Sequence, residues 1–393
     1  MTARPPSTNE SNSVQAPTPE EAFSIELDFL ARLDDGPRPS GWKRTPKAVV
    51  TFVMGSGPDA LALPRGVSAG DGPRKLTITP KFVGDRALVE RCVVTLAGER
   101  GLLLVGEPGT AKSMLSELLS AAISGTSSLT VQGTAGTTED HLRYGWNYAL
   151  LLAQGPSPAA LVPSPVMTAM RHGALARVEE VTRCLPEVQD ALVSILSDRR
   201  ISIPELAADL ASDATQPAVP GFNIIATANL RDRGVSEMSA ALKRRFNFEL
   251  VEPIADHAAE VALVRRQATE ALTRSGATLD VDDAVLDALV TAFRDLRIGR
   301  TKEGWSVERP GSVLSTAEAV SIATSLGIQA AYFTKDRDVL SLLPGYFLGT
   351  VRKDDPTDQA RLLGYWDAAV KRRSDAGDRV WRRLWELRSI LET

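Results

Sequence analysis

Cysteine and histidine are scarce in this chain of 393 residues, which contains two cysteines and three histidines. Cys92 and Cys184 are far apart in the sequence and share no CxxC spacing. The histidines, His141, His172 and His257, form no metal-ligand pattern either. These absences argue against a disulfide framework and against a zinc site.

Long apolar runs and an excess of one charge are also absent. No run is long enough to span a bilayer, and residues 1–21 lack the apolar stretch of a signal peptide, so we expect a cytoplasmic protein without membrane insertion. The 45 Lys and Arg against 49 Asp and Glu give a net charge of −4. A general nucleic-acid-binding protein would be strongly basic, so the charge disfavours nucleic acid as a partner but does not exclude a local basic patch.

The composition divides the chain into four segments. Residues 1–20 are rich in Pro, Ser, Thr and Asn with almost no aliphatic side chains, which predicts a disordered tail. Residues 21–80 form a small N-terminal extension, residues 81–255 an α/β core, and residues 256–393 a helical lid with further C-terminal helices. Within the extension we expect a helix over Ala22–Leu33 and β-like runs at Ala48–Met54 and Lys75–Thr79.

Strands alternate with helices in the expected core. Gly101–Val105 is a continuous apolar run, as in a strand that is covered on both faces of a parallel sheet. Further strands are expected at Leu129–Val131, Ala174–Val178 and Phe222–Ala228, and helices at Arg86–Ala97, Ser113–Ile123 and Pro186–Ser197. The fold class is therefore α/β, a parallel sheet flanked by helices. The all-helical part that follows has predicted helices at Asp283–Leu296, Ser312–Ser325 and Arg379–Leu391.

A phosphate-binding loop is predicted at Gly106–Ser113, where GEPGTAKS follows an apolar strand and opens a helix. Backbone N–H groups of such a loop and the helix N-terminus attract phosphate. Lys112 neutralises the β- and γ-phosphates, and the Ser113 hydroxyl binds Mg²⁺. Ala111 stands where the motif usually has glycine, a small cost if that position has right-handed helical dihedrals.

Two carboxylates and an amide follow the later strands. Glu179 and Glu180 end one strand, and since successive side chains of a strand point to opposite faces, each carboxylate can serve a different step of nucleotide hydrolysis. We assign Glu179 to Mg²⁺ and Glu180 to activation of the attacking water. Asn229, at the end of the strand Phe222–Ala228, is expected to hydrogen-bond the γ-phosphate or that water. Arg177, inside the strand before the acid pair, is unusual.

Three arginines are candidates for phosphate contacts. Arg244 or Arg245, at the end of a predicted helix, would act as an arginine finger that reaches a neighbouring subunit, although basic residues at a helix end also simply favour the helix dipole. Arg309, before a predicted helix of the lid, is a candidate for a contact within the same chain.

Together these residues resemble the AAA+ ATPases, and among them the MoxR-like branch, over Phe82 to Ser325. GEPGTAKS is similar to the phosphate loop of that branch, in which other members also have alanine before lysine. VQGTAGTTEDHLRYG resembles the loop after its second strand, and PEVQDALVSILSDRRISI its helix plus pre-sensor hairpin. IIATANLRDRGVSEMSAALKRRF resembles its sensor 1 and finger region. Phe82-Val83-Gly84 resembles the segment that packs on adenine. Glu179 departs from the aspartate common in the family.

The resemblance implies ATP and Mg²⁺ as cofactors, a homo-oligomeric ring, usually a hexamer, with sites between subunits, and a partner such as a von Willebrand A domain protein. The residues expected to contact the nucleotide are Val83, Gly84, Glu107, Pro108, Gly109, Thr110, Ala111, Lys112, Ser113, Met114 and Arg309.

Three functions stay open at this point. The first is an ATP-driven, chaperone-like remodeller of proteins. Tyr144, Trp146 and the insertion Arg199–Pro220 would then form its substrate loops, although the two aromatic residues could instead belong to the core. The second is a DNA motor or loader, supported by a basic C-terminal stretch, although Trp381 and Trp385 at helical spacing favour a packed helix. The third is a weakly hydrolysing, nucleotide-gated scaffold. The basic stretch comprises Lys371, Arg372, Arg373, Arg379, Arg382, Arg383 and Arg388.

Overall fold

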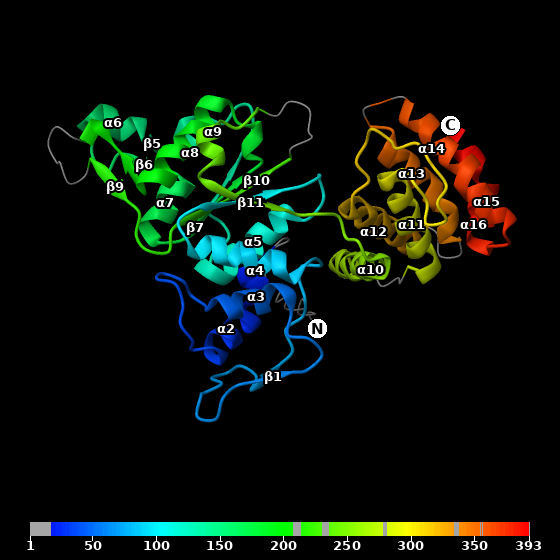
Figure 1. Cartoon of the computed structure of the whole chain (residues 1–393), viewed down its shortest axis with the longest axis horizontal. Coiled ribbons are helices and arrows are strands. Elements are labelled where there is room, and N and C mark those ends of the chain that lie inside the picture. Colours follow the sequence, from blue (N-terminus) through cyan, green and yellow to red (C-terminus); the bar gives the residue numbers. More distant parts are fainter. Residues whose placement is uncertain are drawn as a thin grey trace, which may run out of the picture.

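The computed structural model describes residues 17–206, 214–229, 236–277, 281–333, 338–353, 355 and 357–392. Figure 1 shows a central sheet with its helices, an N-terminal region packed beneath it, and a helical C-terminal region to one side. Residues 1–16 of the predicted tail lie outside the described part. Pro19 and Glu20, which were expected in that tail, instead belong to helix α1 (Pro19–Ala22), because the Glu20 carboxylate accepts hydrogen bonds from the N–H and hydroxyl of Ser127.

A five-stranded parallel sheet forms the centre of the molecule, in the order β11-β3-β10-β7-β4. Every residue of β3, β7 and β10 is buried, as expected for strands covered on both faces. The edge strand β11 was not predicted, because its five residues alternate apolar and polar side chains and contain no continuous apolar run; its Phe248 and Leu250 are exposed. The strands are β3 (Gly101–Val105), β4 (Thr130–Gln132), β7 (Leu175–Glu179), β10 (Asn223–Ala228) and β11 (Phe246–Leu250).

Helices cover the sheet and two small hairpins extend beyond it. The predicted helix Arg86–Ala97 is confirmed, and the segment that resembles a pre-sensor hairpin does pair as one, Arg200–Ser202 with Thr215–Pro217. The helices are α4 (Arg86–Ala97), α5 (Lys112–Ser124), α7 (Pro165–His172), α8 (Pro186–Asp198) and α9 (Ala240–Lys243). The hairpins are β5 (Tyr144–Trp146) with β6 (Leu161–Pro163), which enclose α6 (Tyr148–Gln154), and β8 (Arg200–Ser202) with β9 (Thr215–Pro217).

The run Ala48–Met54, expected as a strand, is a helix. Helix α3 (Pro46–Met54) has proline at its first position. The preceding residue, Thr45, caps it, because its hydroxyl accepts a hydrogen bond from the N–H of Ala48. This Thr-Pro pair is a helix-start signal that outweighs the β-branched composition, because the apolar side chains of α3 are buried by packing. The predicted helix over Ala22–Leu33 is confirmed as α2 (Ser24–Leu33), and β1 (Leu61–Ala62) pairs with β2 (Lys75–Leu76).

The N-terminal region shares its hydrophobic core with the sheet. Side chains of α2 and α3 belong to one buried cluster with those of α4, α5 and strand β3. Phe52 and Val53 of α3 are completely buried in that cluster. Arg44 is also buried and donates to the carbonyls of Leu27 and Ala122, which ties α2 to the C-terminal end of α5. Residues 17–80 therefore form one layer of the core.

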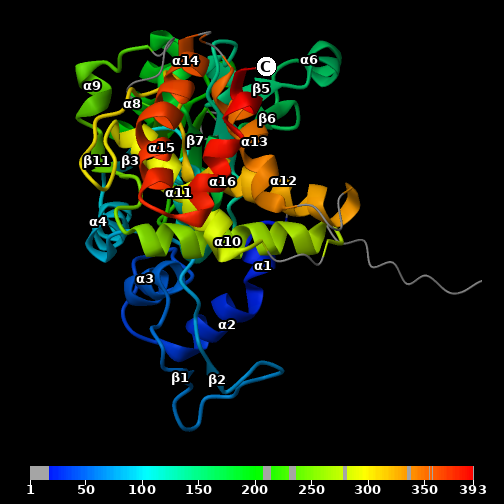
Figure 2. The ribbon, with the colours of Figure 1, turned by 90° about the vertical axis from the view of Figure 1, so that its right-hand side faces the viewer.

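The C-terminal region is a single helical unit, since one buried cluster runs from Val264 to Leu391. Figure 2 shows α10 as a long helix along the lower edge of this unit. Helix α12 begins at Thr316 rather than at Ser312, because the Asp358 carboxylate holds the N–H groups of Gly311 and Ser312 in a loop. Its helices are α10 (His257–Arg274), α11 (Asp283–Ile298), α12 (Thr316–Phe333), α13 (Leu343–Val351), α14 (Thr357–Tyr365), α15 (Lys371–Asp375) and α16 (Arg379–Glu386), with a π-helical turn at Trp366–Val370 and 3₁₀ turns at Val339–Leu342 and Arg388–Glu392.

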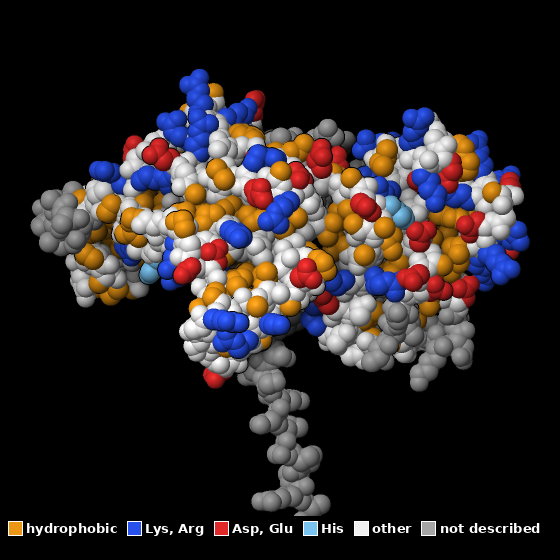
Figure 3. Space-filling view, turned by 60° about the horizontal axis from the view of Figure 1, so that its bottom comes forward, with side chains coloured by type: hydrophobic (Ala, Val, Ile, Leu, Met, Phe, Trp, Pro, Cys, Tyr) orange, Lys and Arg blue, Asp and Glu red, His pale blue; other side chains and the backbone are white. Residues whose placement is uncertain are grey.

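Most side chains of the basic C-terminal stretch are engaged inside this unit. Arg373 lies 4.5 Å from the ring centre of Trp381, and Arg372 5.2 Å from that of Trp305. Lys371 and Arg388 both lie over Trp385. On the face shown in Figure 3, Lys and Arg side chains are interspersed with Asp and Glu. These contacts favour the packed-helix interpretation of the stretch over a DNA-binding one.

Among the described residues, no helix has the length and apolar character needed to cross a lipid bilayer.

We expect Phe52→Ala to lower the free energy of unfolding of the core by about 3–5 kcal/mol, because it removes a completely buried aromatic ring from the layer shared with the sheet. Ile25→Ala, on the neighbouring helix α2, is the control, since Ile25 is 62% exposed and its loss should cost no more than about 0.5 kcal/mol. Denaturant unfolding measures both. Equal stabilities of the two variants would contradict a shared core.

Candidate functional site

The loop Gly106–Ser113 leaves β3 and enters α5, as predicted. A Cβ atom at Gly106 would lie 2.4 Å from the carbonyl oxygen of Val251, and one at Gly109 would lie 2.2 Å from the Cβ of Ser315. Gly109 also has a φ of +76°. Glycine is required at both positions, because the end of β11 and the helical region come too close to the loop for any side chain.

Ala111 differs from its expected conformation. Its φ of 66° and ψ of 24° are left-handed helical, so the condition under which alanine would cost little, right-handed helical dihedrals, is not met. Alanine pays a steric cost of about 1–2 kcal/mol in that region, which glycine avoids. The loop therefore carries backbone strain immediately before Lys112, as is common at functional sites.

Lys112 and Ser113 begin helix α5 and line a cavity of about 350 Å³. The Lys112 ammonium donates to the carbonyls of Gly106 (3.0 Å) and Glu107 (2.6 Å) across the loop. The remaining loop residues that were expected to contact nucleotide, from Glu107 to Ala111, line the same cavity, and Met114 does so too. This is the geometry of a loop whose backbone N–H groups and helix N-terminus face one anionic ligand.

Glu179, at the end of β7, is 4% exposed and accepts four hydrogen bonds. Its Oε2 accepts from the hydroxyls of Ser113 (2.7 Å) and Thr227 (2.8 Å), and its Oε1 from Ser116 (2.6 Å) and the Arg177 guanidinium (2.8 Å). Burial raises the pKa of the Glu179 carboxyl, but the donors from Ser116 and Ser113 and the charge of Arg177, with Thr227, outweigh burial and lower the pKa below its usual value. The hydrogen bonds thus favour the charged form of Glu179 and hold both of its oxygens in place.

Neither Ser116 nor Thr227 was expected in the site. Thr227 is a polar side chain inside strand β10, whose other residues after Asn223 are apolar, and this signal could have found it. Ser116 lies one turn beyond Ser113 on α5 and carries no such signal.

Glu180 faces the cavity from the residue after β7. Its φ of 53° and ψ of 46° are left-handed, and its N–H donates to the Thr227 hydroxyl (2.9 Å). Its carboxylate pairs with Arg183. The turn sends Glu179 into the protein and Glu180 toward the cavity, as predicted from their adjacency at a strand end.

Asn229 lines the same cavity just beyond β10 and is 7% exposed. Its side-chain oxygen accepts no hydrogen bond from any described residue. This buried oxygen is therefore available to accept a hydrogen bond from a water or from a donor group of a ligand in the cavity. The residues after it, 230–235, lie outside the described part of the chain.

One wall of this cavity is formed by residues 82–83, which belong to the segment that resembles the adenine-packing segment of AAA+ proteins. Phe82 and Val83 line the cavity together with Met114 and Leu263, whereas Gly84 does not. The segment is held from two sides, since Lys81 pairs with Glu26 of α2 and Arg266 of α10 donates to the Pro80 carbonyl (3.0 Å).

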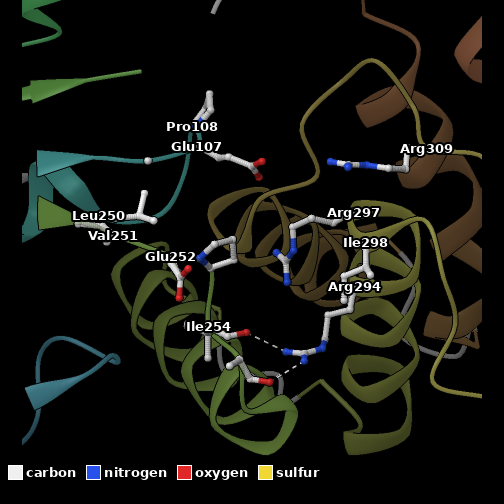
Figure 4. Close-up of a pocket in the computed structure, with 13 residues that line it drawn as sticks. Glu107, Pro108, Leu250, Val251, Glu252, Ile254, Arg294, Arg297, Ile298 and Arg309 are labelled. Atoms are coloured by element: carbon white, nitrogen blue, oxygen red, sulfur yellow. Dashed lines mark hydrogen bonds between the residues drawn. The ribbon is translucent and has the colours of Figure 1, made fainter. Parts of the chain in front are cut away.

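A second cavity of about 520 Å³ lies on the other side of Glu107 and Pro108, and Arg309 lines it instead of the first cavity. Figure 4 shows Arg294, Arg297 and Arg309 on the helical side, opposite Glu107 on the loop side. Arg294 donates to the carbonyls of Ile254 and Ala255, and both Arg294 and Arg297 pair with the buried Glu260. These contacts attach the helical region to residues 251–256, the linker between β11 and α10.

The two finger candidates are not brought to either cavity of their own chain. Arg245 donates to the Ser197 hydroxyl (2.6 Å), while the Arg244 side chain is exposed. Tyr144 is 9% exposed and donates to Glu205, so it is a core residue, and Trp146 packs against its ring. Residues 207–213 of the expected substrate insertion lie outside the described residues.

Oxygen atoms are the only candidate metal ligands here, and the described residues contain no cluster of three or more His, Cys, Asp or Glu side chains. Ser113 Oγ and Glu179 Oε2 lie 2.7 Å apart at the cavity. Mg²⁺ is usually held by one or two protein oxygens together with phosphate oxygens and water, and this pair fits that donor set.

Two family models match the chain. Residues 101–246 match the AAA domain of the dynein-related subfamily, and residues 258–392 match the C-terminal domain of YehL-like AAA+ ATPases. The uncharacterised protein YehL of Escherichia coli (strain K12) is 45% identical over 383 residues, which cover 97% of this chain and 99% of that protein. The uncharacterised protein SH1500 of Staphylococcus haemolyticus (strain JCSC1435) is 26% identical over 232 residues, 59% of this chain and 81% of that protein.

Solved structures show a more distant likeness. NtrX from Brucella abortus in complex with ADP has 15% identity and a TM-score of 0.45, over 79% of this chain and 69% of that one. The Holliday junction branch migration motor RuvB of Thermotoga maritima has 14% identity and a TM-score of 0.40, over 74% of this chain and 78% of that one. Nothing about function follows from likeness at this level.

We expect Ala111→Gly to leave the free energy of unfolding unchanged or to raise it by up to about 1 kcal/mol, because relief of the left-handed strain offsets the extra entropy of an unfolded glycine. Ala262→Gly, at an exposed position inside α10, is the control and should lose about 1 kcal/mol. Denaturant unfolding compares them. A loss at Ala111 as large as that at Ala262 would be evidence against the strain.

Proposed function

We infer the function of this chain from the premise that it belongs to the family of YehL-like AAA+ ATPases. We propose that it binds Mg-ATP in the 350 Å³ cavity and hydrolyses it, and that hydrolysis drives the remodelling of a protein partner in the cytoplasm.

The observation that carries this proposal is the gathering of five polar groups at one end of the sheet: four of them line that cavity, and the fifth, Glu179, lies behind them and accepts a hydrogen bond from Ser113. Lys112 and Ser113 come from the start of α5, Glu179 and Glu180 from the end of β7, and Asn229 from the end of β10. Parallel strands bring these ends to one edge of the sheet. A cationic side chain, two carboxylates and an amide around a phosphate loop are the parts that ATP hydrolysis requires.

Each group has a role in this mechanism. The Lys112 ammonium exchanges the loop carbonyls for the β- and γ-phosphate oxygens. Ser113 and Glu179 would hold Mg²⁺, which when bound neutralises charge on the β- and γ-phosphates. Glu180, on the solvent side of its turn, orients the attacking water and accepts its proton, and Asn229 donates to the γ-phosphate or to that water.

Arg244 is the better candidate for an arginine finger. Its side chain is exposed, whereas Arg245 is held by Ser197 of its own chain. Because neither lines the cavity of its own chain, a finger would have to act on a neighbouring copy, which requires a head-to-tail contact between subunits, as in a ring. The resemblance to MoxR-like proteins supports a hexamer and a partner with a von Willebrand A domain.

We expect wild-type protein to release phosphate from ATP and Glu180→Gln to lower kcat by about a hundredfold or more, because the amide cannot accept the proton of the attacking water. ATP affinity should be retained in Glu180→Gln and lost in Lys112→Ala, which is the matched control for binding. Steady-state phosphate release and equilibrium binding of labelled ATP measure the two effects. Equal, near-zero rates for wild type and Glu180→Gln would favour the nucleotide-gated scaffold instead.

We expect Arg244→Ala to lower kcat by about a thousandfold, while Arg245→Ala has a small effect. Lys112→Ala and Arg244→Ala should each be inactive alone, but their mixture should regain activity, because some interfaces then combine an intact loop with an intact finger. Phosphate release by mixtures at fixed total protein is the measurement. A mixture that stays inactive would count against a finger supplied by the neighbour.

A further inference from the structure

Two residues that are unusual in the sequence lie on the same face of β7. Arg177 is inside the strand and Glu179 at its end, two residues apart, so their side chains point to the same side of the sheet. Both are almost fully buried, at 5% and 4% exposure. They form an ion pair, with the Arg177 Nη2 donating to Glu179 Oε1 at 2.8 Å.

Arg177 is fixed by contacts on every side of its guanidinium. Its Nε donates to the Ser116 hydroxyl (2.9 Å), and its Nη1 donates to the Ser127 carbonyl (2.9 Å) and the Thr130 hydroxyl (3.1 Å). The Glu117 carboxylate lies 3.2 Å from Nη1. These partners belong to α5, to β4 and to the segment before β4, so Arg177 cannot swing toward the cavity, which it does not line.

The two oxygens of Glu179 have separate sets of donors. Arg177 and Ser116 both donate to Oε1, on the side of the carboxylate that faces the interior. Ser113 and Thr227 both donate to Oε2, and these two residues line the nucleotide cavity. The charge of Arg177 therefore acts on the oxygen that is turned away from the cavity.

We propose that Arg177 is a positioning residue for metal binding. With Ser116 it anchors Oε1, so that Oε2 stays against the Ser113 hydroxyl where a Mg²⁺-bound water would be held. The pair also accounts for glutamate at position 179. Its additional methylene lets the carboxylate reach Ser116, one turn along α5 from Ser113, while the guanidinium locks the longer side chain in place. This inference rests on the proposed binding of Mg-nucleotide.

Binding of a fluorescent ADP analogue tests the proposal without reference to hydrolysis. The analogue is titrated first in EDTA and then with increasing MgCl₂, and the midpoint of the Mg²⁺-dependent gain in affinity is recorded. We expect Arg177→Met to raise that midpoint about tenfold or more, as loss of residues that orient a metal ligand commonly does, with little change of affinity in EDTA. Arg177→Lys, which keeps the charge but not the fork of donors, should give an intermediate shift.

Arg44→Met is the matched control for a purely structural effect. Arg44 is a buried arginine that contacts the opposite end of the same helix α5, so its loss should lower thermal stability but leave the Mg²⁺ midpoint within about twofold of wild type. Ser116→Ala removes the other donor to Oε1 without burying an unpaired charge, and it should shift the midpoint in the same direction as Arg177→Met.

The outcomes separate this proposal from the proposed function. If wild type shows Mg²⁺-dependent binding while Arg177→Lys and Ser116→Ala both keep the wild-type midpoint, the positioning role is wrong and the proposed function stands. If wild type binds no nucleotide, or binds it without any effect of Mg²⁺, the proposed function fails at its first step. Should Arg177→Met not fold, Arg177→Lys and Ser116→Ala decide the question.

Discussion

The buried carboxylate of Glu179 connects the elements on which the rest of the site depends. Its four donors come from the phosphate loop and helix α5, from β10 and from its own strand. A buried charge is stable only when such donors surround it, and removing one of them costs more than the bond itself contributed. The loop, the sheet edge and the helix are therefore held in one arrangement, and Lys112, Ser113 and Glu180 take their positions from it.

The cavity is completed by regions on either side of the sheet. The N-terminal region contributes the Glu26–Lys81 pair beside Phe82 and Val83, and the helical region contributes Leu263, Arg266 and the contact of Ser315 with the loop. Because the helical region lines the same cavity as the phosphate loop, nucleotide in it would contact the sheet and the helical region at once. This arrangement is suited to converting occupancy of the site into a movement of the helical region relative to the core.

Much of the fold could be predicted from local pattern. A continuous apolar run gave the bounds of β3, and largely apolar runs gave those of β7 and β10 to within one residue, because strands covered on both faces tolerate few polar residues. Helix α3 could not be predicted from composition, since its β-branched residues favour a strand when the packing around them is ignored. The edge strand β11 was missed because its residues alternate apolar and polar side chains and contain no continuous apolar run.

The sequence by itself determined which chemistry is present: a phosphate loop, an acid pair and a strand-end amide in a fixed order, because each is a short motif whose function depends on neighbouring residues. Only the tertiary structure decided how these groups meet. It places Ala111 in a left-handed conformation, divides the donors of Glu179 between two oxygens, and leaves Arg309 outside the nucleotide cavity. These features depend on contacts between residues far apart in the chain, such as Gly109 with Ser315, and no local pattern encodes such contacts.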